Sequence, residues 1–219
     1  MAKLPPIPNR LQQIDQLIVG DHYYIAPDDE CYFCWEYVVK GGYVQYDVND
    51  FIHNLEIPSD WPDPWRLVHK TKAIAFAAKA LQSLIPADLK QASTFVPVPP
   101  SKIKGDPAHD DRLTRTLRSI VSPLRDVREL VLQNENTVSK GKQIPPSERA
   151  ANYRINEECA SPDPTHIVLV DDVLTTGSHF KGAMMVLQQR YPGVPIVGLF
   201  LARAIRPDVI PVAPDDITL

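Results

Sequence analysis

The sequence predicts an α/β fold, a twisted parallel sheet with flanking helices, together with a small N-terminal α+β region. Three observations support this class. From residue 65 onward, short apolar segments alternate with longer segments whose apolar residues recur at helical spacing, as in βαβ units. The apolar run Ile167–Val170 is typical of a strand that is buried on both faces. A chain of 219 residues is also long enough to build one such domain with a substantial core.

Residues 1–64 are expected to form an accessory region, or hood, that contains a β-hairpin. Apolar spacing predicts a short helix over Asn9–Val19, and a brief second helix around residues 51–57. Aromatic and β-branched content predicts three strands: His22–Ile25, Tyr32–Val39 and Tyr43–Val48. The Gly-Gly pair at positions 41 and 42 would connect the last two strands as the hairpin.

The segment Trp61–Trp65 marks the boundary between this region and a core of residues 65–219, because its two prolines interrupt any regular element. In the core, helices are predicted from about Trp65 and over Asp111–Val121. Four strands are predicted: Phe95–Val98, Val127–Leu132, Ile167–Val170 and Ile196–Leu201. Residues 133–148 would form a polar loop. Strands that are separated by helices are expected to run parallel, connected by right-handed crossovers.

The most informative segment begins with the strand Ile167–Val170 and ends at Ser178. Asp171 and Asp172 follow the apolar run, and two adjacent carboxylates would be costly in a core, so we expect them at or beyond the strand tip. Gly177 permits backbone conformations that other residues avoid, and Ser178 is a good N-cap for a following helix. The apolar positions of that helix recur at helical spacing: Phe180, Ala183, Met184, Leu187 and Tyr191.

This arrangement predicts a site for a sugar phosphate. The first amides of the helix and its positive dipole end would face the loop, which favours a phosphate. Thr175, Thr176 and Ser178 would add hydroxyl donors. Asp171 and Asp172 only accept hydrogen bonds when ionised, so they suit the 2′- and 3′-hydroxyls of a ribose. An ordinary strand–helix turn without a ligand is the alternative.

These residues resemble the phosphoribosyl-pyrophosphate (PRPP) motif of type I phosphoribosyltransferases, and the resemblance, which covers about residues 65–205, is closest to the ComF-like branch. In that family the acidic pair holds the ribose and the Thr-Thr-Gly-Ser loop holds the 5′-phosphate. Thr94–Pro99 is similar to the strand that leads into the pyrophosphate loop. The resemblance implies that PRPP is bound by two segments: Asp171, Asp172, Val173, Leu174, Thr175, Thr176, Gly177 and Ser178, and Pro99, Pro100, Ser101 and Lys102.

The resemblance further implies a reaction in which a base or amine displaces pyrophosphate from C1 of PRPP through an oxocarbenium-like transition state, with Asp171, Asp172 and Lys102 as catalytic residues. Mg²⁺ would be bound through PRPP, so no dedicated protein metal site is expected. Residues 133–148 would form a lid that brings Lys140 and Lys142 over PRPP.

Two further arginines are candidates by resemblance. Arg149, with Asn152, matches an Arg-x-x-Asn pattern and is assigned to the same flexible region, where it could hold pyrophosphate or the acceptor. Arg203, within a segment similar to the last core strand, is a candidate for the acceptor site. A homodimer is one possible assembly, since dimers are common among similar proteins.

The chain departs from the ComF-like pattern in two places. It has one Cys-x-x-Cys pair, Cys31 and Cys34, where that branch often has two. Such a pair is half of a zinc site, for which His22 and His53 could supply the other ligands; simple buried thiols are the alternative. The stretch after Pro100 also lacks the arginine-rich sequence ending in Asn-Gln.

Composition limits the remaining function classes. The net charge of −4 gives no basic excess for nucleic acid as the main partner. The sequence has no run of 18 apolar residues, so it predicts no membrane span. It has no signal-like apolar segment at the N-terminus, and a cytoplasmic location is therefore expected. Two functions stay open: an active phosphoribosyltransferase, and a non-catalytic PRPP- or nucleotide-binding regulatory protein. A phosphoacceptor receiver domain is excluded because only 47 residues follow Asp172.

Overall fold

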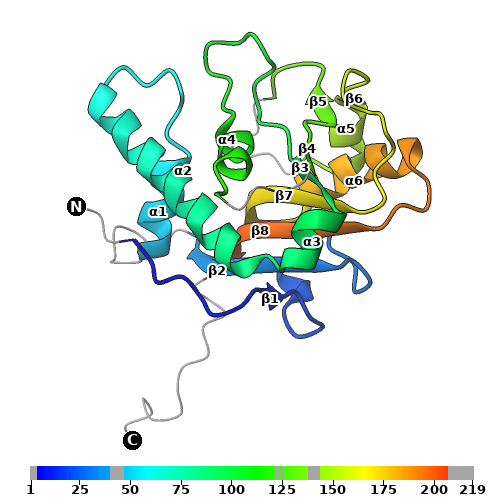
Figure 1. Ribbon diagram of the computed structural model, residues 1–219, viewed down its shortest axis with the longest axis horizontal. Helices are drawn as coiled ribbons and strands as arrows, with labels where there is room; N and C mark the ends of the chain where they lie inside the picture. Colours follow the sequence, from blue (N-terminus) through cyan, green and yellow to red (C-terminus); the bar gives the residue numbers. More distant parts are fainter. Residues whose placement is uncertain (1–3, 40–46, 122–123, 125, 138–143, 207–219) are drawn as a thin grey trace, which may run out of the picture.

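The computed structural model describes residues 4–39, 47–121, 124, 126–137 and 144–206. Within these residues, six strands form a central sheet in the order β1-β2-β8-β7-β3-β4 (Figure 1). All neighbours pair in parallel except β1, which is antiparallel to β2. The strands are β1 (Gln12–Gln13), β2 (Cys31–Val38), β3 (Thr94–Pro97), β4 (Asp126–Val127), β7 (Ile167–Leu174) and β8 (Ile196–Ile205). A separate antiparallel pair consists of β5 (Val131–Gln133) and β6 (Tyr153–Ile155).

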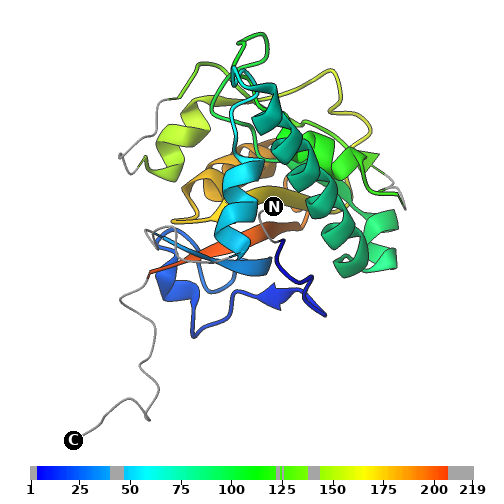
Figure 2. The same cartoon turned by 90° about the vertical axis from the view of Figure 1, so that its left-hand side faces the viewer.

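Helices cover both faces of this sheet. They are α1 (Asp47–Leu55), α2 (Pro64–Leu84), α3 (Ala87–Ala92), α4 (Arg112–Arg118), α5 (Pro146–Ala151) and α6 (Ser178–Arg190), with a 3₁₀ turn at Val19–Asp21. Figure 2 shows α1 and α2 lying side by side. One hydrophobic cluster joins α1, α2 and α4 to the sheet, and a second joins α6 and the β5–β6 pair to the opposite face.

The side chains of β7 alternate between these two clusters. Val168 and Val170 belong to the first cluster, whereas Ile167 and Leu169 belong to the second. A strand with apolar side chains on both faces must be covered on both faces, as its continuous apolar sequence predicts. The predicted α/β class, with a mostly parallel sheet flanked by helices, is therefore confirmed.

The N-terminal segment differs from its prediction. Instead of a helix over Asn9–Val19, it forms the short strand β1 and then the 3₁₀ turn, while His22–Ile25 is a turn rather than a strand. The reason is tertiary: Ile14 packs into the second cluster, and the Tyr24 N–H donates to the Thr176 carbonyl at 2.8 Å. These long-range contacts outweigh the local apolar spacing.

The predicted hairpin partner of β2 is not found in the described residues. Residues 40–46, including the Gly-Gly pair, lie outside them, and positions 47 and 48 already belong to α1. β2 pairs instead with β1 and, in parallel, with β8. The central sheet is thus continuous across the predicted boundary near residue 64, and the division into a hood and a core stays a prediction.

Three parts of the predicted core are also corrected. The strand expected over Val127–Leu132 is divided between β4 and β5, which belong to different sheets. The helix expected over Asp111–Val121 ends at Arg118, and the side chain of Val121 is exposed. The polar loop of residues 133–148 includes the end of β5 and the start of α5. Short elements of this kind carry too little periodicity to be recognised from sequence.

Cys31 and Cys34 lie on opposite faces of β2. Residues three apart on a strand point to opposite sides, and the two thiols accordingly belong to different hydrophobic clusters. Burial raises the pKa of both thiols to about 12. One zinc ion cannot be held by two thiols that the sheet separates, and the described residues contain no group of three metal-ligating side chains. None of the described helices has the length and apolar content needed to cross a bilayer.

Gly198 in β8 provides a test of the packing between the sheet and α6. A Cβ atom at this position would lie 2.8 Å from Cys31 Sγ and 2.9 Å from the rings of Phe180 and Phe200. We expect Gly198→Ala to lower the free energy of unfolding by about 1–3 kcal/mol through overpacking. Gly20→Ala is the control, because a Cβ there meets no atom within 4 Å. Urea denaturation followed by circular dichroism measures the free energy of unfolding of both variants. Equal losses of stability would contradict close packing at Gly198.

Candidate functional site

The candidate site lies where β3 and β7 end, at the carboxyl edge of the parallel sheet (Figure 1). A pocket of about 540 Å³ opens there. Two predicted segments form part of its wall: Pro99, Pro100, Ser101 and Lys102 after β3, and Asp171, Asp172, Val173 and Thr175 at the end of β7. The structure therefore brings together segments about 70 positions apart, at the edge where ligands of parallel sheets usually bind.

The acidic pair lies inside β7 rather than beyond its tip, which corrects the prediction. β3 stops pairing with β7 at Val170, but β8 continues, with Asp171 opposite Phe200 and Leu174 opposite Arg203. β7 therefore keeps one neighbour while its other side opens to the pocket. This geometry lets carboxylates occupy strand positions, because the missing β3 partner leaves them access to polar groups.

Asp172 is buried and forms an ion pair with Arg112, at the start of α4. Arg112 donates to Asp172 Oδ2 from Nε at 2.8 Å and from Nη2 at 2.5 Å. Arg112 Nη1 also donates to Asp110 Oδ2 at 2.8 Å, and Lys70 Nζ donates to the same Asp110 oxygen at 2.7 Å. A continuous chain of charged hydrogen bonds thus connects β7 to α2.

The pKa values of the two neighbouring carboxyl groups are shifted in opposite directions. Burial raises the pKa of Asp171 well above its ordinary value, and the charge of Asp172 raises it further. Burial acts on Asp172 in the same direction, but the charge and hydrogen bonds of Arg112 outweigh it, so the pKa of Asp172 is lowered. Asp172 is therefore the permanent anion, and Asp171 is the group of the pair that binds a proton more readily.

The loop after β7 is held from the N-terminal segment. Gly177, with φ +84°, is the N-cap of α6, and Ser178 is its first helical residue, so the predicted cap is displaced by one position. A Cβ on Gly177 would lie 2.6 Å from Ile25 Cδ1. His22 Nδ1 also lies 2.6 Å from the Thr175 carbonyl oxygen. Position 177 thus requires glycine for two reasons: its φ is positive, and a side chain there would collide with Ile25.

The hydroxyl of Ser178 is engaged within the protein. It donates to the carbonyl oxygen of Ile144, and Arg149 Nε donates to it at 3.3 Å. Arg149 is buried on α5, which packs closely on α6 because Gly182 has no side chain. Arg149 therefore supports the start of α6 directly. Lys140 and Lys142 of the predicted lid lie outside the described residues.

Lys102 lies on the pocket wall, as predicted for a pyrophosphate-binding residue. Within the described part of the chain, its ammonium group has no hydrogen bond or ion pair. The carbonyl oxygen of Pro100 accepts a hydrogen bond from the Gln133 side chain, which anchors this loop to β5. A second cavity of about 220 Å³ adjoins the first across Pro99, Pro100 and Lys102.

Among the described residues, six predicted site residues do not line this pocket: Leu174, Thr176, Gly177, Ser178, Arg149 and Arg203. Leu174 is buried in the second hydrophobic cluster. Arg203 is buried over the ring of Phe33 and donates to Asp21 Oδ2 at 3.0 Å and to Glu36 Oε1 at 2.5 Å. These contacts tie β8 to the N-terminal segment. Arg203 does not line this pocket, and its role at an acceptor site stays a prediction.

Four ionisable residues of the pocket wall were not assigned to the site from the sequence: Glu56, Asp110, Arg112 and His179. Glu56 lies between α1 and α2. The charged run at residues 110–112 is evident in the sequence. Asp172, the β7 residue that pairs with Arg112, is 60 positions away and gives no local signal. The burial of Lys70 could have been predicted from the sequence. Lys70 occupies the apolar stripe of a predicted helix, four residues before Ile74 and seven before Ala77. A lysine in such a stripe predicts a buried partner.

His179, the second residue of α6, lies on the pocket wall. Its Nδ1 lies 3.2 Å from the Tyr153 hydroxyl oxygen. Burial, together with the charge of Arg149, lowers its pKa to about 4. The imidazole is therefore neutral at physiological pH and adds no positive charge to the pocket.

Comparison of the chain with protein-family models and with curated proteins finds no match. The assignment of the site therefore depends on the motif residues and on their geometry. Around one pocket lie Asp172, with a lowered pKa, Asp171, with a raised pKa, and Lys102, whose ammonium has no ion pair among the described residues.

Gly177 and Gly193 form a matched pair for testing the loop. Both have a positive φ, but a Cβ at Gly193 meets no atom within 4 Å. Alanine should cost each position about 1–2 kcal/mol of backbone strain, and Gly177→Ala should cost about 1–3 kcal/mol more through its contact with Ile25. Thermal and urea unfolding measure the difference. Equal destabilisation would show that Ile25 does not constrain the loop.

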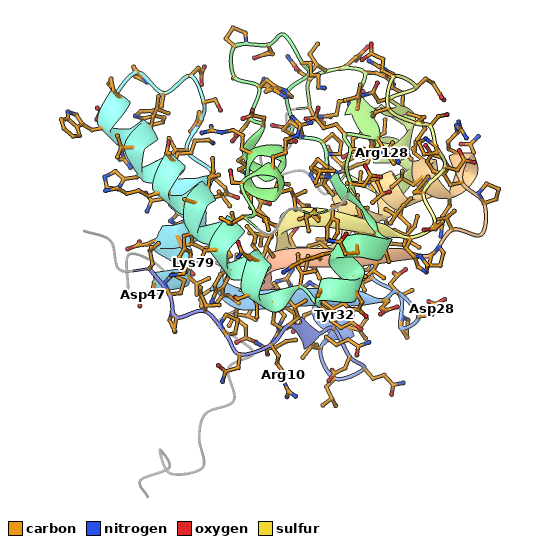
Figure 3. The ribbon with its side chains drawn as sticks, viewed as in Figure 1. Arg10, Asp28, Tyr32, Asp47, Lys79 and Arg128 are labelled. Carbon is orange, nitrogen blue, oxygen red and sulfur yellow. The ribbon has the colours of Figure 1, made fainter. Side chains whose placement is uncertain are left out.

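The buried chain of charges predicts a large effect at Lys70, which is 2% exposed. Lys70→Met leaves Asp110 without one of its cations, and we expect a loss of about 3–5 kcal/mol in the free energy of unfolding. Lys79→Met is the control on the same helix, where Lys79 is exposed (Figure 3). Its effect should stay within about 0.5 kcal/mol. A small loss at both positions would argue against the network.

Proposed function

We propose that this protein is a phosphoribosyltransferase that binds PRPP with Mg²⁺ and transfers its phosphoribosyl group to a nitrogenous acceptor, with release of pyrophosphate. One observation carries the proposal: the loop Pro99–Lys102 and four residues of the predicted motif, Asp171, Asp172, Val173 and Thr175, line one pocket at the carboxyl edge of the sheet. We also infer that the sheet belongs to the type I phosphoribosyltransferase arrangement, for which a mostly parallel sheet with flanking helices is the coarse requirement.

In this proposal each segment binds one part of PRPP. Asp171 and Asp172 accept hydrogen bonds from the ribose hydroxyls. The amides at the start of α6, with Thr175 and Thr176, hold the 5′-phosphate. The loop Pro99–Lys102 holds the pyrophosphate. The Lys102 ammonium, which has no ion pair among the described residues, stabilises the negative charge that develops on the pyrophosphate as it leaves.

The pocket residues fit a magnesium complex of the substrate. Mg²⁺ prefers oxygen ligands and usually keeps phosphate and water oxygens in its shell, where it would neutralise the pyrophosphate charge. Asp171 is the carboxyl group of the pair that Arg112 does not bind, so it is available to the complex. Asp172, held by Arg112, keeps its charge whether the ligand is bound or not.

A binding function without turnover is the second candidate, and one observation favours it. Two groups that were expected to contact PRPP are already satisfied inside the protein: Asp172 by Arg112, and the Ser178 hydroxyl by Ile144. A regulatory protein that senses PRPP or a nucleotide would keep the pocket but would release no pyrophosphate.

Calorimetric titration with PRPP and Mg²⁺ tests the proposed function. The unaltered protein should bind, and Asp171→Asn should weaken binding about 10- to 100-fold, because hydrogen bonds to a charged acceptor are lost. Asp88→Asn, an exposed carboxylate on α3, is the matched control and should bind normally. Absence of PRPP binding by the unaltered protein would reject the proposal. Pyrophosphate release then separates the enzyme from the regulatory protein.

PRPP affinity should depend on pH through Asp171. The raised pKa means that Asp171 is protonated over part of the acidic range, where it accepts fewer hydrogen bonds from the ribose. Affinity should therefore rise with pH as Asp171 ionises, and binding below this transition should release a proton. Calorimetry in buffers with different ionisation enthalpies measures that proton. A pH dependence that persists in Asp171→Asn would contradict the assignment.

A further inference from the structure

Glu56 lines the same pocket as the acidic pair and Lys102, but it comes from the connection between α1 and α2, outside the motif. Its two neighbours, Leu55 and Ile57, are buried. Leu55 ends α1 and Ile57 follows the turn at Glu56, so this turn cannot rotate without exposing apolar surface. The carboxyl group of Glu56 is therefore presented to the pocket from an anchored backbone.

Lys70 fixes this backbone on both sides of Glu56. Its Nζ donates to the carbonyl oxygen of Leu55 at 3.1 Å and to that of Ile57 at 2.6 Å. The same nitrogen donates to Asp110, which shares Arg112 with Asp172. The peptide that carries Glu56 and the proposed ribose-binding carboxylate are thus held by one hydrogen-bonded chain. Such rigid support is what a group that acts on a reacting atom requires.

The surrounding groups shift the pKa of the Glu56 carboxyl group to near neutral pH. Glu56 is an exposed residue of the pocket wall. Partial desolvation by the surrounding protein nevertheless raises its pKa to about 7, and the negative charge of Asp172 contributes next. Asp110 acts in the same direction, whereas the cations Arg112 and Lys70 oppose it. Burial and, next, the charge of Glu56 raise the pKa of the Tyr37 hydroxyl on β2. A carboxyl group of this kind exchanges protons readily at neutral pH.

We propose that Glu56 is the general base of the transfer reaction and that the acceptor is therefore a nitrogen nucleophile that carries an N–H proton. This inference rests on the proposed function. The acceptor nitrogen forms a bond to C1 of PRPP, and the bond from C1 to the pyrophosphate oxygen breaks with its electron pair on pyrophosphate. The proton of the acceptor nitrogen passes to the Glu56 carboxylate and then to solvent.

This assignment restricts the class of acceptor. Amines, and bases that react through a ring N–H, must lose a proton to give a neutral product, and they profit from a base in the pocket. A pyridine-type nitrogen has no proton to lose, so Glu56 would give it no advantage. The position of Glu56 thus selects N–H acceptors over pyridine-type acceptors.

Pyrophosphate release from PRPP and Mg²⁺ tests the inference with four probes: hydroxylamine, adenine, uracil and, as a pyridine-type nitrogen, nicotinate. At least one N–H probe should accelerate release, and nicotinate should not. Glu56→Gln should lower kcat for that probe about 100-fold or more, with PRPP affinity unchanged. The rate of the unaltered protein should rise with pH through about 7, as the Glu56 carboxylate forms, and this limb should disappear in Glu56→Gln.

Two further variants separate a chemical role from a structural one. Asp60→Asn, a nearby exposed carboxylate that does not line the pocket, should behave as the unaltered protein. In Glu56→Ala, added formate should restore part of the rate, because an external carboxylate can take the place of the lost one. Restoration by formate is not expected if Glu56 only supports the turn.

The outcomes distinguish the two proposals. Absence of PRPP binding rejects the proposed function and the inference with it. PRPP binding without release above the buffer rate for every probe overturns the inference and favours the binding-only protein. Release that is as fast in Glu56→Gln as in the unaltered protein, or release with nicotinate alone, overturns the role of Glu56 while the proposed function stands.

Discussion

The charge of Asp172 is the constraint on which the site depends. A carboxylate in a strand that is covered on both faces must be paired, because an isolated buried charge is very costly. Arg112, the first residue of α4, provides that pair. Its own charge is shared with Asp110, and Asp110 in turn binds Lys70 of α2. One strand residue is thus connected through charged hydrogen bonds to α4, to α2 and to the connection between α1 and α2.

The same chain of charges divides the carboxyl groups of the pocket into two kinds. Asp172 stays ionised because Arg112 lies against it, whereas Asp171 and Glu56 have raised pKa values because they are desolvated beside an anion. A pocket with one permanent anion and two groups that exchange protons can bind a polyhydroxylated ligand and also transfer a proton. Lys102 supplies the unpaired positive charge on the opposite segment.

The N-terminal segment contributes to the site through backbone contacts. The turn His22–Ile25 holds the carbonyl oxygens of Thr175 and Thr176 and packs on Gly177. α5 supports the other side of the same loop through Arg149 and Ser178. The proposed phosphate loop is therefore clamped from two directions, which reduces the entropy lost when a phosphate binds.

The sequence by itself determined the α/β class, the long helix α2 and the strand–loop–helix unit from Ile167 to Arg190, because each depends on local periodicity that a single segment contains. It also identified the two segments that form the pocket wall. The pairing of Arg112 with Asp172, the clamp of Lys70 around Glu56, the engagement of Ser178, and the removal of Arg203 from the pocket were decided by the tertiary structure. These are contacts between residues 13 to 182 positions apart. Their geometry depends on how the elements pack, and no local pattern encodes it.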